Sequence, residues 1–245
     1  MSHSPSGGRS HHSDRNEPHR HRLRGQCVAA LVAAATLAVV ASGCASSEDT
    51  PKAPAARRSS GTLGSGFIDA ATPPAPESMI RPRPGSWDAV RPPRGYYVVL
   101  LTAGDDPPTT MLVMEVEQWA NAEHVTLETV AVTEPDAFVD GIVEAMNLTP
   151  DLVICAGHAL VDALALVTAS HLNQQFLVVG AQLPEPTVNV TAAVWREASS
   201  RGGEVPDTAS SFDPDAFTHR HVAAAIRAGV ASVLSNITGI VIWLD

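Results

Sequence analysis

Small polar residues follow three apolar runs of the sequence, and a tryptophan ends a fourth run. Glycine lets a ligand approach backbone N–H groups, aspartate accepts hydrogen bonds from hydroxyl or amine groups, and an aromatic side chain can stack on a ring. The candidate ligand-binding residues are Gly104, Asp105, Asp106, Gly157, His158, Gly180, Gln182 and Trp195.

Each of these residues also has a purely structural alternative. Asp105 and Asp106 are common turn formers, His158 could simply begin a helix, and Trp195 could belong to the core. The sequence has no phosphate-binding loop, dinucleotide-binding glycine motif, nucleophile elbow or zinc-protease motif. His219 and His221 share no helical face and lack an evident third metal ligand. We therefore predict a protein that is not an enzyme and has no cofactor, with a hydrolase as the least favoured alternative.

Strands and helices are expected to alternate around these residues. Apolar runs rich in β-formers predict strands, and helical spacing of apolar residues predicts helices between them. Strands are expected at 96–103, 125–132, 151–156, 175–179, 188–194 and 239–245. Helices are expected at 109–124 with Thr109 as cap, from Pro135 to about 146, at 158–172, and from Pro214 to about 235.

This alternation predicts an α/β fold with one doubly wound parallel sheet. Repeated strand–helix–strand units with short connections form right-handed crossovers. Ligands of such sheets bind beyond the carboxyl ends of the strands, near the switch in strand order. The candidate residues follow strands and would therefore meet at that edge.

The N-terminal region predicts export. Residues 1–26 carry five arginines against Asp14 and Glu17, residues 27–41 are uncharged and apolar, and Ser42-Gly43 precede Cys44. This order is typical of a secretory signal, and the apolar run is shorter than the roughly 20 residues that span a bilayer. The segment at residues 41–44 resembles the lipobox of bacterial lipoproteins, with Ala41 in place of the usual leucine.

The resemblance implies cleavage after residue 43 and lipidation of Cys44, which would hold the chain on the extracytoplasmic face of the cell membrane. An ordinary cleaved signal and a transmembrane anchor are the alternatives. Of the other cysteines, Cys27 leaves with the signal, and Cys155 lies in an apolar run and is expected to be buried. No disulfide pair remains.

Composition then bounds the rest of the chain. The whole sequence has 16 Lys+Arg and 26 Asp+Glu, and without residues 1–43 it has 11 and 24, a net charge of −13. An acidic body argues against nucleic acid as a partner. Residues 44–93 are rich in Ser, Pro and Ala and predict a disordered tether, although Trp87 and Val90 at its end could pack on the domain. Residues 94–245 would form the single domain.

Several motifs in the domain resemble one known family. In order, they are Pro150-Asp151-Leu152-Val153-Ile154, Gly157, Asp162-Ala163-Leu164, Phe176-Leu177-Val178-Val179, Asn189-Val190 and Trp195-Arg196-Glu197. They resemble the basic membrane protein family of ABC-transporter substrate-binding lipoproteins over about 100 residues. Pro107-Pro108-Thr109-Thr110 and Gly180 depart from the family pattern.

The resemblance implies a Rossmann-like lobe of a type I periplasmic binding protein, a nucleoside-like ligand and a permease partner. That family has two lobes, and this chain is expected to match the first lobe only, as a divergent relative. Two main hypotheses stay open. The chain is a membrane-anchored solute-binding lipoprotein, or it is a ligand-free module that docks on a membrane or envelope protein.

Overall fold

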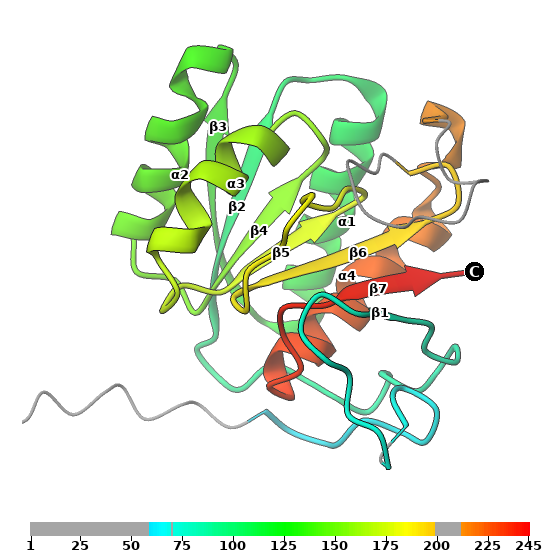
Figure 1. The fold of residues 1–245 in the computed structure, drawn as a ribbon. Coiled ribbons are helices and arrows are strands. Elements are labelled where there is room, and N and C mark those ends of the chain that lie inside the picture. The colour runs from blue at the N-terminus through cyan, green and yellow to red at the C-terminus, as the bar shows by residue number, and fades with distance from the viewer. Residues whose placement is uncertain (1–58, 70, 199–211) are drawn as a thin grey trace, which may run out of the picture. The chain divides into compact units, whose positions relative to one another are not determined.

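The computed structural model describes residues 59–69, 71–198 and 212–245. Its described part holds one sheet of seven parallel strands in the order β1-β7-β6-β5-β4-β2-β3 (Figure 1). The strands are β1 (Met79–Ile80), β2 (Tyr97–Ala103), β3 (Thr126–Val132), β4 (Leu152–Ala156), β5 (Phe176–Val179), β6 (Val190–Trp195) and β7 (Val241–Leu244). The sequence predicted every strand except β1.

Helices cover both faces of the sheet. Helices α1 (Pro107–Glu123) and α4 (His219–Leu234) pack together on one face, and α2 (Phe138–Asn147) and α3 (Val161–Val167) pack on the other (Figure 1). The doubly wound α/β fold is confirmed. No helix among the described residues is long and apolar enough to cross a membrane.

The central strands are continuous apolar runs because both of their faces are buried. Alternate residues of β2 belong to different cores: Leu100 packs under α1 and α4, whereas Leu101 packs under α2 and α3. Cys155 on β4 joins the second core and is fully buried. The two cores hold the strand ends in fixed register, so the loops that follow the strands have a rigid base.

Strand order reverses at β2, which lies between β3 and β4. The chain runs from β2 outward to β3 and then returns past β2 to β4, before it continues through β5, β6 and β7. Loops after β2 and β4 therefore diverge to opposite faces of the sheet. This reversal is the switch point at which open α/β sheets commonly bind ligands.

The segment 59–93 was expected to be part of a tether, but the structure packs its described residues on the domain. Phe67 is 2% exposed and Trp87 is 6% exposed, and both belong to the core under α1 and α4. Met79 and Ile80 form β1, which pairs with β7. The segment has no apolar periodicity because it is built from turns and single anchoring side chains, and a periodicity search does not detect such packing.

Helix boundaries differ from the expectation in all four helices, and α2 begins at Phe138 after a 3-10 turn at Pro135–Ala137. Asp106, not Thr109, caps α1, because its carboxylate accepts a hydrogen bond from the Thr109 N–H at 3.1 Å. The helix expected at 158–172 is α3 followed by a short 3-10 turn at Thr168–Ser170. The last helix begins at His219 with Thr218 as cap, after a separate 3-10 turn at Pro214–Ala216.

Candidate functional site

Three turn glycines end neighbouring parts of the sheet at its carboxyl edge. Gly104 follows β2, Gly157 follows β4 and Gly180 follows β5, with φ angles of 82°, 91° and 78°. Such positive φ values favour glycine, which has no Cβ to clash with the backbone. The structure thus brings the three predicted loops to one edge, with the first two at the switch point.

The two aspartates of the first loop differ in their contacts. Asp106 Oδ1 accepts from the Thr109 N–H, and Asp106 Oδ2 accepts from the Thr109 hydroxyl at 2.8 Å. Asp106 therefore acts as a helix cap, which was its structural alternative. Asp105 is exposed, and its backbone carbonyl accepts from the Thr110 hydroxyl at 3.3 Å.

Aromatic side chains cover the other predicted loops. The His158 ring lies 5.2 Å from Phe212, Phe212 lies 5.8 Å from Phe217, and Phe217 lies 5.0 Å from Trp195, measured between ring centroids. A Cβ on Gly180 would lie 2.6 Å from Phe217 Cε1. Phe217 thus occupies the space directly beside Gly180, and this part of the edge is filled by the protein's own side chains.

The two remaining predicted residues are buried. Gln182 is 4% exposed in the loop after β5, and Trp195 is 1% exposed at the end of β6. The Trp195 indole N–H donates to the Ala216 carbonyl at 2.9 Å. This bond ties the end of β6 to the 3-10 turn before α4 and orients the indole ring.

A cavity of about 410 Å³ lies at the carboxyl ends of β6 and β7. It shares only Trp195 with the residues predicted from the sequence. Its wall combines apolar groups with several carboxylates, and it is lined by Trp195, Arg196, Glu197, Asp213, Asp215, Ala216, Thr218, His221, Leu244 and Asp245. This cavity is the candidate ligand site.

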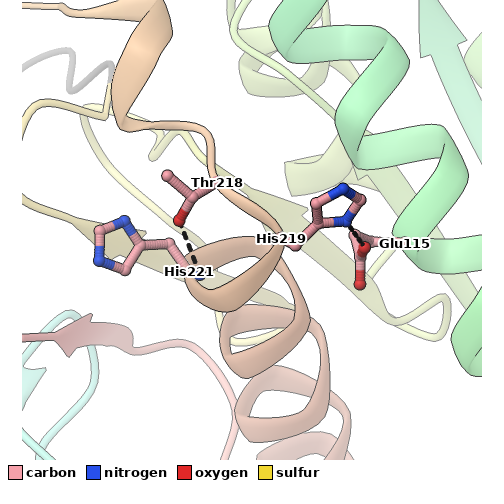
Figure 2. Close-up of polar contacts among 4 residues, drawn as sticks. All are labelled: Glu115, Thr218, His219 and His221. Carbon is pink, nitrogen blue, oxygen red and sulfur yellow. Dashed lines mark hydrogen bonds and ion pairs between the residues drawn. The ribbon is translucent and has the colours of Figure 1, made fainter.

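His221 reaches the cavity from the first turn of α4. Its backbone N–H donates to the Thr218 hydroxyl at 3.3 Å (Figure 2). Its ring Nδ1 lies 3.0 Å from the Ala216 carbonyl. The ring also lies 6.0 Å from the Trp195 ring. The bond to Thr218 caps the helix, and the contact between ring Nδ1 and the Ala216 carbonyl orients the imidazole.

His219 lies on the opposite side of α4 from His221 (Figure 2). Its Nδ1 contacts the carboxylate of Glu115, a buried residue of α1, so this pair joins the two helices on one face of the sheet. The expectation that the two histidines share no face is confirmed. No group of three or more metal-binding side chains lies together within the described ranges.

The sequence analysis missed most of the cavity. The residues come from three separate segments, and only the Asp213-Pro214-Asp215 turn and Glu197 carried local signals. Cys155 contributes nothing to the site because it lies in the opposite core, where burial raises the pKa of its thiol. Cys44, the predicted lipidation residue, and the predicted signal at 1–43 lie outside the described residues.

No family model and no curated protein matches the sequence. Among solved structures, the chain is similar to an ABC transporter solute-binding protein from Aeropyrum pernix K1, at 18% identity and a TM-score of 0.38 over 41% of this chain and 29% of that one. It is also similar to a fragment named as a candidate lipoprotein from Peptoclostridium difficile 630, at 13% identity and a TM-score of 0.41 over 56% of this chain and 97% of that one. A LacI transcriptional regulator from a Rhodococcus species is similar at 14% identity and a TM-score of 0.33 over 61% and 57%. With TM-scores this low, the likenesses assign neither a family nor a function to the chain.

Proposed function

We propose that this chain is a lipid-anchored, extracytoplasmic solute-binding protein that takes a small polar molecule at the carboxyl edge of its sheet. The observation that carries the proposal is the cavity of about 410 Å³ beyond β6 and β7. Small-molecule sites commonly have volumes of about 300–1,000 Å³ and combine apolar walls with a few polar groups. Such sites also form at the carboxyl edge of parallel sheets, although this cavity lies beyond β6 and β7 and not at the switch point at β2.

Features of the sequence supply the cellular setting. The lipobox-like residues before Cys44 favour an anchor on the extracytoplasmic face, and the motifs shared with the basic membrane protein family favour a permease partner. The same resemblance makes a nucleoside-like solute one class to test. A net charge of −10 argues against nucleic acid as a partner.

A thermal-unfolding screen tests the proposal. The full-length chain, purified in detergent micelles, is followed by tryptophan fluorescence with nucleosides, bases, sugars, amino acids and amines. A solute at 100 times its Kd adds about 2.7 kcal/mol of stability, which raises the Tm by several degrees. The Asp215→Ala variant should show a clearly smaller shift at the same solute concentration. The Asp136→Ala variant, changed at an exposed residue of the 3-10 turn before α2, should keep it.

A flat response across the whole screen would contradict solute binding and favour docking on a membrane or envelope protein. One observation supports this second function: the exposed apolar side chains of Val139 and Val143 on α2 and of Leu166 on α3, which is 75% exposed. Helices α2 and α3 pack beside each other, so these exposed side chains lie on neighbouring helices. A site-specific cross-linker at Leu166 would then identify the partner.

A further inference from the structure

The polar groups of the cavity are mainly hydrogen-bond acceptors. Among the described residues that line it, four carry carboxylates, namely Glu197, Asp213, Asp215 and Asp245, and Arg196 carries a positive charge. Two of the carboxylates already have partners: Asp213 Oδ1 accepts from the Asp215 backbone N–H at 2.9 Å, and Asp245 pairs with Arg81 at 3.2 Å. The carboxylates of Glu197 and Asp215 remain as the acceptors to which we assign a ligand.

His221 adds an acceptor of a different kind. The Ala216 carbonyl lies 2.9 Å from the Trp195 indole nitrogen and 3.0 Å from His221 Nδ1. Since a carbonyl oxygen can only accept, Nδ1 must carry the proton. In the neutral ring, Nε2 is then the acceptor. A ligand beside His221 could therefore donate a hydrogen bond to Nε2.

The backbone of Glu197 brings its side chain to the same wall. Glu197 has a φ of 67°, in the left-handed region, and its carbonyl accepts from the Asp213 N–H at 3.0 Å. This bond joins the two segments that form opposite sides of the cavity, namely the end of β6 and the turn before α4. Trp195, Ala216 and Leu244 complete the lining, and only 1%, 8% and 5% of these residues is exposed.

We propose that the cavity binds a small organic cation, namely a primary amine that carries an alkyl or aryl group. The ammonium group donates to Glu197, Asp215 and His221 Nε2, and the carbon part lies against the few exposed apolar atoms of Ala216 and Leu244. A group with several N–H donors matches this set of acceptors, whereas the excess of carboxylates repels phosphates and carboxylic acids. The inference rests on the proposed solute-binding function and names its substrate class.

Isothermal titration of the full-length chain in detergent tests this class with matched pairs of probes. The amines are 1,5-diaminopentane and 2-phenylethylamine, and the neutral controls are 1,5-pentanediol and 2-phenylethanol. We expect saturable binding of at least one amine, at least tenfold tighter than its alcohol, and weaker binding at high salt. Asp215→Asn should weaken amine binding by about fivefold, the effect of one exposed charge pair of about 1 kcal/mol.

Further variants separate charge from folding. Asp215 uses only its backbone N–H in the turn, so Asp215→Asn keeps that hydrogen bond. The double variant Glu197→Gln with Asp215→Asn should bind the amine at least tenfold more weakly than the wild type. The control variant Asp136→Asn should bind it with the wild-type affinity. Amine binding no tighter than alcohol binding, or unchanged in the double variant, would overturn the cation class. Binding of a nucleoside with the same affinity by the wild type and the double variant would also overturn the cation class. The proposed solute-binding function would remain supported in that case.

Discussion

The sheet and its covering helices exclude water from the side chain of Cys155. The residue lies in β4 and is fully buried, and desolvation raises the pKa of its thiol. Tyr96, the residue before β2, has its pKa raised mainly by burial and further by the nearby charge of Asp151. Neither group can ionise in the folded state at pH values where it ionises in the unfolded chain.

Stability should therefore fall as pH rises past the thiol's unfolded pKa of about 8.5. Above that pH the unfolded chain binds fewer protons than the folded chain, so the free energy of unfolding decreases, by up to about 1.4 kcal/mol per pH unit for one thiol. Urea unfolding between pH 7 and 10 measures this slope. The Cys155→Ala variant should be less stable at pH 7 but have a shallower slope above pH 8.5. Equal slopes in the two proteins would show that Cys155 ionises in the folded state.

The sequence identified residues of suitable type for ligand binding, but it did not show which of them lie together in the folded chain. Asp106 and Trp195 were sensible ligand candidates by type, yet one caps a helix and the other is buried against Ala216. His221 and Asp215 were missed because the cavity forms only when the turn before α4 returns to the end of β6. Contacts across a separation of 21 residues, such as Trp195 to Ala216, leave no periodic signal in the sequence.

The first turn of α1 offers a test at the scale of an element. Asp106→Ala removes the side chain that accepts from the Thr109 N–H and hydroxyl, so we expect a loss of about 1 kcal/mol in the free energy of unfolding. Asp106→Asn should retain most of the stability, because asparagine caps helices about as well as aspartate. The exposed neighbour variant Asp105→Ala should change stability by less than about 0.5 kcal/mol. Chemical denaturation of the three variants measures these differences, and an equal loss in Asp105→Ala would contradict the assigned cap.

Strands were predicted more accurately than helix starts for a physical reason. A strand buried on both faces must be apolar throughout, and β4 and β5 are read directly from such runs. A helix start depends instead on which of several adjacent polar residues supplies the cap. Thr218 rather than Asp213 caps α4, because Phe217 leaves the helical path and packs against Trp195.

The order of strands is a property of the whole molecule and could not be derived from the sequence. Local patterns give the strands and their parallel pairing, but β1 joins β7 across about 160 residues of chain. Packing of the segment 59–93 also shortens the connection to the predicted anchor. Between Cys44 and Ser59 lie 14 residues, which can span at most about 50 Å. A permease partner would therefore have to lie close to the anchored domain.

The same segment gives a prediction about the stability of the whole domain. Phe67 contributes a fully buried ring to the core under α1 and α4, so Phe67→Ala should cost about 3–5 kcal/mol, as buried phenylalanine truncations commonly do. Thr72→Ala, at an exposed position of the same segment, should be close to neutral. A chain that begins at residue 94 should melt well below one that begins at residue 59, because it loses Phe67, Trp87 and β1 together. Thermal unfolding of these proteins compares the two boundaries directly. If both chains melted at the same temperature, residues 59–93 would add nothing to the core, and the domain would begin at residue 94 as the sequence suggested.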